Sequence, residues 1–285
     1  MTETYSFKSI RLTMTLDTAG GGNQFSFEDF ACHVSISKTG GVDFAKAAVE
    51  IYGLSLETMA KLTALSFRPL ARRNNLLQIE AGEKGGTLSV IFQGEVTTSF
   101  ADLNGSCPVL KIEAQTGAYP ILKPEPQQAI KGQQDAGGLI AMLANSTGKT
   151  FRNDGVSATV SDCVITGEPV TKMRQVANAV GADLLIDDDE IVLRPRGKQR
   201  SATGTVPVLS AQTGMIGYPT FSSQGITANS YFRPDFKIGA AVRIESIVPF
   251  ATGIWKIVSL KHELAVNSPT MNAWRTSIEG MWLNE

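Results

Sequence analysis

Apolar and polar residues alternate along most of the first 120 residues, which is the period-2 pattern of half-buried β-strands. The clearest runs cover residues 10–16, 32–36, 47–51, 77–81, 88–92 and 110–114. In the run at 88–92, Leu88, Val90 and Phe92 are expected on one face. Asn104-Gly105 is a strong hairpin signal before the last run. Such short, regularly spaced strands predict a closed or nearly closed barrel.

Only two interruptions stand out in this region. The glycines at 20–22 with Asn23 predict a loop. After Ser55, which can cap a helix, Leu56, Met59, Ala60 and Thr63 recur at helical spacing, and Pro69 bars much extension.

Residues 120–135 are rich in proline and glutamine and predict a linker. The segment that follows, 136–196, has the pattern of an α/β unit. Helices are expected over 139–143 and from Glu168-Pro169 to about Gly181, where a left-handed residue suits a helix end. A strand is expected within 156–165, and a hairpin pairs 184–186 with 191–193 around the acidic run Asp187 to Glu190.

A second linker is predicted over 197–204, after which strand patterns return. Val242 and Ile244 share a face, and an alternation from 256 to 264 is expected to place Lys256, Val258, Leu260, His262 and Leu264 together. A last strand carries Trp274, Thr276, Ile278, Gly280 and Trp282 on one face, with Arg275, Ser277 and Glu279 on the other. The chain is therefore predicted to be mainly β, with β domains at 1–122 and 201–285 flanking a small α/β domain with linkers at 123–200.

Composition excludes several classes of protein. Of the 285 residues 42% are hydrophobic and 19% charged, and the net charge is −1. A disordered polyelectrolyte is excluded, no global field favours nucleic acid or an anionic membrane, and the low charge favours a surface hidden in an assembly.

Cys32, Cys107 and Cys163 are too few and too far apart for a disulfide framework or a zinc site, so a reducing compartment is expected. Neither a signal peptide nor a transmembrane helix is expected, and hence no stable membrane insertion.

Candidate chemistry is weak throughout. Gly148-Lys149-Thr150 ends like a phosphate-binding loop, but it follows a helix where the motif needs a strand, so a helix end is favoured. Asp187 to Glu190 offers oxygen ligands for calcium without the required spacing, and a solvated hairpin turn is favoured.

His262 lies on an apolar strand face with Glu263 pointing away, and no G-x-S-x-G elbow accompanies it, so a hydrogen-bonded core histidine is favoured over a catalytic one. Cys32 and His33 point to opposite faces of a strand and cannot easily share a metal. Paired carboxylates could meet only in the fold, and nothing singles out a pair. No catalytic, cofactor-binding or metal-binding residue is predicted, and no cofactor. Two small basic clusters, one of Arg68, Arg72 and Arg73 and one of Lys198 and Arg200, suit either solvent or an acidic partner.

Fragments along nearly the whole chain resemble phage baseplate hub proteins in order and spacing. Val49 to Ser55 followed by Met59 to Leu65 is similar to the strand–helix element of that family, and Ala81-Gly82 with Ile91 to Val96 is similar to its following hairpin. The middle and the end continue the likeness, over 165–170, 181–183, 213–219, 232–246, 255–262 and 274–276. No lysozyme or peptidoglycan-hydrolase segment, which some spike complexes carry, is visible.

The resemblance implies two tail-tube-like β-barrel domains joined through the smaller domain, in a structural protein that is not an enzyme. It implies a homotrimeric ring in the virion tail baseplate, assembled in the host cytoplasm. That ring would join a hexameric tail tube, or distal tail protein, to a trimeric central spike and contact other baseplate proteins. DNA would pass through its lumen without sequence-specific binding. Two alternatives stay open: a spike adaptor of a phage-derived contractile device of pyocin or secretion-system type, and a cell-wall-binding or cell-wall-cleaving module.

Overall fold

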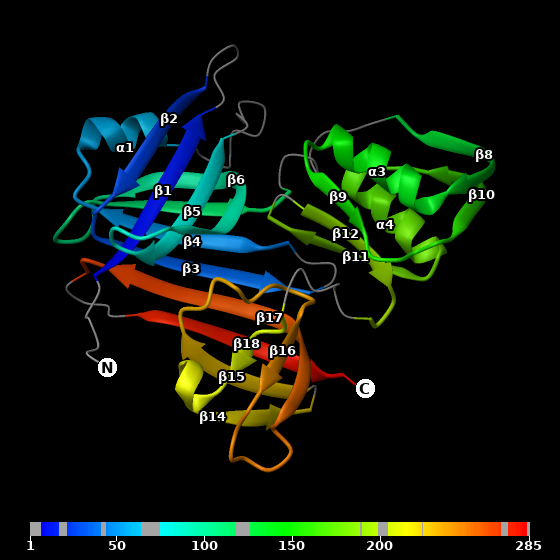
Figure 1. Cartoon of the computed structure of the whole chain (residues 1–285). Coiled ribbons are helices and arrows are strands. Elements are labelled where there is room, and N and C mark those ends of the chain that lie inside the picture. The colour runs from blue at the N-terminus through cyan, green and yellow to red at the C-terminus, as the bar shows by residue number, and fades with distance from the viewer. Residues whose placement is uncertain are drawn as a thin grey trace.

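The computed structural model describes residues 7–16, 22–40, 44–63, 75–117, 126–188, 190–198, 205–223, 225–268 and 273–283. Most of the elements are strands, and a thirteen-stranded sheet runs through both ends of the chain in the order β14-β15-β18-β17-β3-β4-β7-β6-β5-β1-β2, with β16 on β17 and β13 on β16. Figure 1 shows the first strands and the last strands meeting along β3 and β17, with the green middle of the chain to one side. The mainly β prediction is therefore confirmed.

The N-terminal half of the sheet forms where strong alternation predicts it. Its strands are β1 (Lys8–Leu16), β2 (Asn23–Glu28), β3 (Cys32–Thr39), β4 (Lys46–Tyr52), β5 (Leu76–Glu83), β6 (Ser89–Asp102) and β7 (Val109–Gln115). The helix α1 (Leu56–Leu62) begins as expected at Ser55, whose side chain accepts a hydrogen bond from Thr58 N. Met59 and Leu62 of α1 are fully buried in the core of this half. Strand β2, which follows the predicted loop, has no counterpart in the sequence prediction.

The middle unit, residues 126–198, has its own core between two helices and two small sheets. Its elements are β8 (Gln128–Asp135), α3 (Ala136–Ser146), β9 (Thr150–Asn153), β10 (Thr159–Ile165), α4 (Pro169–Ala179), β11 (Ala182–Asp187) and β12 (Glu190–Pro195). Strand β8 pairs with β10, and β12 lies between β11 and β9. The linker predicted over 120–135 is therefore wrong from residue 128, because polar glutamines can occupy an exposed strand whose ladder is completed by β10.

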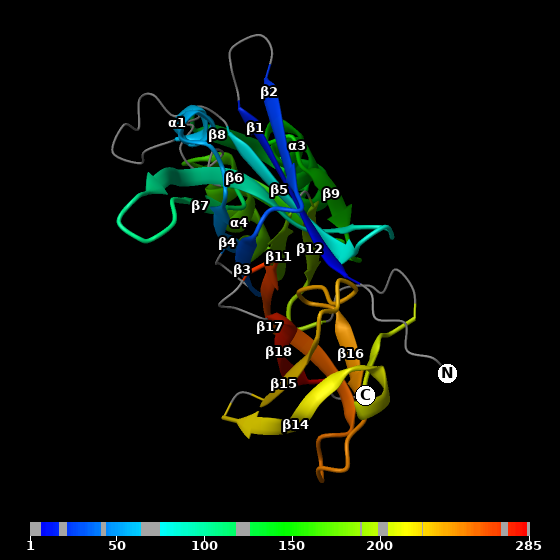
Figure 2. The ribbon, with the colours of Figure 1, turned by 90° about the vertical axis from the view of Figure 1, so that its left-hand side faces the viewer.

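The C-terminal half contains β13 (Val208–Leu209), a 3-10 turn at Ala211–Thr213, β14 (Met215–Ser222), β15 (Gly225–Tyr231), β16 (Ala241–Ile244), β17 (Gly253–Val266) and β18 (Trp274–Trp282). Its core also takes in Leu185 and Val192 from the hairpin of the middle unit. The middle unit is therefore packed against the sheet and is not merely tethered to it. Figure 2, turned by 90°, shows the C-terminal strands below the N-terminal ones.

Two β-bulges change which side chains face the core. In β6 a register shift at Ile79/Glu80 on its partner β5 leaves Val90 exposed and buries both Ile91 and Phe92. In β17 a shift between Ile257 and Ser259 lets Trp255 and Ile257 face the core before it and Leu260, His262 and Leu264 after it. The single alternation predicted at 88–92 is therefore wrong, and the one predicted at 256–264 is confirmed for Leu260, His262 and Leu264 but wrong for Lys256 and Val258, because an inserted residue reverses the faces of a strand.

No closed barrel occurs within the described residues. Strands β2 and β14 are the two ends of the sheet, and β17 pairs with β3 from Ser259 to Val266, so the β regions share one open sheet where two separate barrels were expected. The predicted domain boundaries at 122/123 and 200/201 stay a prediction and fall at segments outside the described residues, as do Gly20, Gly21 and Pro69.

Candidate functional site

The junction between β17 and β3 gives eight consecutive strands, from β14 at one end of the sheet to β6, one continuous face that points away from both cores. These strands are β14, β15, β18, the second half of β17, β3, β4, β7 and the second half of β6. Side chains that pair across the ladder fall in rows, such as Asn229, Ser277, Lys261 and Ser37. We call this surface the polar face, because its positions are mostly Ser, Thr, Asn, Glu and Lys and are exposed or half-buried. The polar side of β18 was predicted from alternation.

Charges on the polar face are mixed, and the acidic side chains outnumber the basic ones. The basic side chains are Lys46, Lys111, Lys261 and Arg275, and the acidic ones are Glu50, Glu95, Asp102, Glu113, Glu263 and Glu279. Burial alone would raise the pKa of Glu263, but hydrogen bonds from Lys261, Ser35 and His33 outweigh it and lower the pKa. The face therefore carries no basic track of the kind that holds a phosphate backbone.

Each end of this face has a strand edge on which no further described strand pairs. Among the residues that the structure describes, strand β14 pairs only with β15, and β6 from Thr97 to Asp102 pairs only with β7, because β5 begins opposite Glu95 and Val96 N donates to Asn75 O. Phe221 of β14 lies opposite the buried Ile226, on the core side of the sheet, yet it is 52% exposed. Unpaired N–H and C=O groups beside exposed apolar side chains are a template for pairing with another chain.

A buried charge cluster fastens the middle unit to the sheet. Lys38 of β3 donates to Asp187 Oδ1 at 3.1 Å and to Asp188 Oδ2 at 2.6 Å, and all three side chains are less than a tenth exposed. Asp188 Oδ1 also accepts from Gln93 N, and its carbonyl accepts from Lys149 Nζ. The predicted solvated acidic turn is therefore wrong for Asp187 and Asp188, because Lys38 lies 149 and 150 residues away and only the fold brings it there; Asp189 lies outside the described residues.

The electrostatics of this cluster follow from one lysine facing two carboxylates. Burial would lower the pKa of Lys38, but Asp187 and Asp188 outweigh it and raise the pKa. Burial and the charge of Asp187 raise the pKa of Asp188 against the pull of Lys38. The Lys38 ammonium therefore stays charged, and both Asp187 and Asp188 depend on it for their ion pairs.

His262 is a hydrogen-bonded core residue, as predicted. It is 2% exposed, its Nδ1 lies 2.9 Å from Thr276 Oγ1, and its ring packs edge-on against Phe232. Burial, helped by the charges of Lys38 and Lys237, lowers its pKa to about 3. The imidazole is therefore neutral at physiological pH, and Glu263 points to the opposite face.

The other predicted features fall where the sequence suggests or lie outside the described residues. Thr147 caps the end of α3, and Gly148 has a φ of 74°, so the phosphate-loop-like tripeptide is a helix end. Cys32 is buried, which raises its pKa to about 12, and His33 faces the other way toward Glu263. Arg68, Arg72, Arg73 and Arg200 are not described.

Within the ranges that the structure describes, no group of three or more His, Cys, Asp and Glu is arranged to hold a metal ion. No described helix is long and apolar enough to cross a membrane.

Comparisons with known proteins give one family match and several matches to solved structures. A family model described as baseplate hub gp41 matches residues 9–271. A tail protein of Neisseria meningitidis MC58 superposes with a TM-score of 0.64 at 10% identity, covering 95% of this chain and 96% of that one. The 43 kDa tail protein of prophage MuSo2 from Shewanella oneidensis gives 0.61 at 9% identity, covering 94% and 96%.

A chain of the Francisella PdpA–VgrG complex gives a TM-score of 0.60 at 8% identity, and the match covers 95% of this chain but 57% of that one. At these identities the structural likeness concerns the fold alone. No curated protein sequence matches significantly.

Proposed function

The chain belongs to the baseplate hub gp41 family, and from this premise we propose that it forms a homotrimeric ring joining a hexameric tail tube to a trimeric central spike. Family membership makes it a structural protein of the phage tail baseplate. The observation that supports the ring is the continuous sheet, which carries strands from both β regions across the β17–β3 pair. Each chain would then supply two sheet segments side by side, one from each β region. Three chains would supply six such segments, which match the six subunits of a six-fold tube.

Ring closure is proposed to use the two free edges. Strand β14 of one copy would pair with the second half of β6 of the next, in a heterologous contact that closes after three copies. Both edges bound the same polar face, so their pairing would extend that face around the ring. The half-exposed Phe221 would then be covered by the neighbouring copy.

The polar face is proposed to line the channel through which DNA leaves. A lumen rich in lysine and arginine would hold the phosphate backbone, and here acidic side chains outnumber basic ones. Asp187 and Asp188 of the middle unit meet Lys38 on the core side of the sheet, and this contact would hold the unit outside the channel.

The experiment is the solution mass by light scattering over a dilution series, alone and with candidate spike protein. A trimeric mass, alone or with the spike protein, supports the ring. A monomeric mass that does not change when the spike protein is added overturns it. The double variant Ile216→Lys with Phe221→Lys should weaken the trimer at least tenfold, because it places charge in an apolar contact. The matched control is Phe250→Lys, since Phe250 is 89% exposed on the loop between β16 and β17, away from either edge.

A second candidate is a spike adaptor in a contractile device with no genome to pass. The fold likeness to a chain of the PdpA–VgrG complex favours it. The ring and its edges would be the same, and the identity of the neighbouring genes separates the two functions.

A cell-wall-cleaving activity has no such support. Clearing of purified peptidoglycan that is lost on substituting one carboxylate would revive it.

A further inference from the structure

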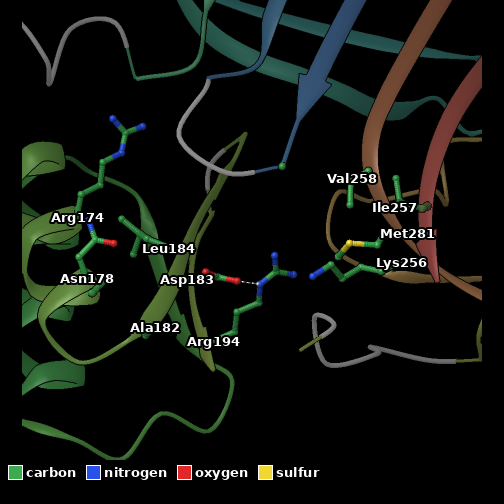
Figure 3. A pocket seen from close by; sticks show the side chains of 12 residues that line it. Arg174, Asn178, Ala182, Asp183, Leu184, Arg194, Lys256, Ile257, Val258 and Met281 are labelled. Carbon is green, nitrogen blue, oxygen red and sulfur yellow. Dashed lines mark ion pairs between the residues drawn. The ribbon is translucent and has the colours of Figure 1, made fainter. Parts of the chain in front are cut away.

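A pocket of about 360 Å³ lies between the middle unit and the C-terminal half of the sheet. Figure 3 shows α4 and the β11–β12 hairpin on one side and β17 with β18 on the other. Its lining combines an apolar wall, which includes Leu184, Ile257, Val258 and Met281, with charged side chains from both sides. No residue of the Lys38 cluster lines it.

Two buried cations face each other across this pocket. Arg194 of β12 and Lys256 of β17 are 5% and 4% exposed, and their side chains point toward one another in Figure 3. Burial, reinforced by the charge of Arg194, lowers the pKa of Lys256. Like charges brought together out of water repel, so this arrangement costs stability unless an anion joins them.

Within the described residues, Lys256 is the member of this pair that has no carboxylate partner. Lys256 Nζ donates to the carbonyl of Gly197 at 3.2 Å, and no described carboxylate lies within salt-bridge distance of it. Arg194 Nη1 donates to the carbonyl of Gly239 at 3.3 Å, and its Nε lies 3.9 Å from Asp183 Oδ2. Asp183 is itself shared, since it accepts from Gly197 N and lies 3.8 Å from Arg196 Nε.

We infer that this pocket binds an oxyanion, a phosphate or carboxylate group, between Arg194 and Lys256. Its oxygens would accept charge-assisted hydrogen bonds from both cations and replace their repulsion by attraction. Any apolar part of the ligand would lie against Ile257 and Met281. Because the cations come from the middle unit and from the sheet, the anion would also strengthen the contact between them. The inference does not depend on the ring.

The test is calorimetric titration of the full chain with inorganic phosphate and, separately, with acetate, each against sodium chloride at equal ionic strength. Lys256→Met should weaken binding at least tenfold, the loss of one charge-assisted hydrogen bond. The control Lys261→Met removes an exposed lysine of the same strand that does not line the pocket, and this variant should bind as the wild type does. A stronger response to phosphate identifies a phosphate site, and an equal or stronger response to acetate identifies a site for a carboxylate.

Stability provides a second measurement with an independent outcome. In chloride, Lys256→Met should unfold at a higher temperature than the wild type, because a repelled buried charge is gone, and phosphate should raise the wild-type midpoint but not that of the variant. Asn178→Trp, a change at an exposed position of α4 on the pocket rim, keeps both cations and should block binding. Equal phosphate responses in the wild type and Lys256→Met would mean an adventitious ion only, and no response to either anion would overturn the inference.

Discussion

At the scale of single residues, the buried ionisable groups carry most of the information about how this chain is held together. Lys38, Asp187 and Asp188 look like ordinary surface residues in the sequence, yet together they tie a hairpin of the middle unit to β3. Their environment follows from contacts made 149 and 150 residues apart. Two residue-scale predictions test this account.

Lys38→Met should lower the free energy of unfolding by about 3–5 kcal/mol, because it leaves two buried carboxylates without their cation. Urea denaturation measures this loss. The control Lys84→Met removes an exposed ion pair with Asp29 and should cost less than about 1 kcal/mol. Adding Asp188→Asn to Lys38→Met should recover part of the loss. Equal losses for Lys38→Met and Lys84→Met would contradict a buried cluster.

His262 should make the protein sensitive to acid. Its folded-state pKa, about 3, lies below the ordinary 6.5, so the unfolded chain takes up a proton that the folded protein does not. Its contribution to stability is therefore present above pH 6.5 and falls by up to about 1.4 kcal/mol per unit as the pH drops toward 3. Urea denaturation at pH 7.5, 5.5 and 4.5 measures this effect. As the pH falls over this range, the free energy of unfolding of His262→Gln should decrease less than that of the wild type. His33→Gln retains His262 and should keep the steep loss, and parallel curves for all three proteins would refute the assignment.

At the scale of elements, strand phase and helix caps determine which side chains reach a partner. The bulges in β6 and β17 reverse the alternation in mid-strand, so that Ile91 and Phe92 are both buried and Leu260, not Val258, follows Ile257 into the core. Helix starts depend on local groups instead. Asp135 ends β8 and caps α3 by accepting from Gly138 N at 2.6 Å, whereas Glu168 begins α4 without a side-chain bond to the helix backbone.

Asp135→Ala should therefore destabilise the protein by about 1 kcal/mol, because an orphaned N–H at the first turn of α3 loses its acceptor. Glu168→Ala, at the matched position of α4, should cost less than half as much. Thermal and urea unfolding of the two variants under identical conditions make the comparison. A loss for Asp135→Ala no larger than that for Glu168→Ala would contradict a stabilising cap at Asp135.

At the scale of the whole molecule, the proposed channel depends on the balance of charges on the side of the sheet that would face DNA. The polar face keeps basic residues few and pairs several of them with carboxylates, as Lys111 with Asp102 and Lys261 with Glu263. Changing that balance should change how DNA behaves in the channel.

Glu113→Lys with Glu279→Lys should convert the assembled ring into a DNA-retaining one. Both side chains are exposed on the polar face, and the exchange should tighten binding of short duplex DNA at least tenfold at about 50 mM salt, with a steeper salt dependence. Fluorescence anisotropy measures both. The control Glu57→Lys with Glu83→Lys makes the same change in net charge at exposed positions on α1 and β5. If the two double variants bound DNA equally well, the polar face would not line a channel.

Features that depend on near neighbours could be predicted from the amino-acid sequence. Alternation located β1, β3 and β4, Ser55 located the start of α1, and Gly148 and Gly181 located helix ends, because caps and strand faces are set within a few residues. The order of its fragments also indicated the baseplate hub family, which the family match over residues 9–271 confirms.

The way in which these elements combine could not be predicted, because it depends on contacts between distant parts of the chain. The β17–β3 pair joins residues more than 200 positions apart, and it produces one open sheet where two barrels were expected. The same long-range contacts bury Asp187 and Asp188 against Lys38 and bring Arg194 opposite Lys256. Local patterning states which side of a strand is apolar, but strand partners and the burial of a charge depend on chain segments that come together only on folding.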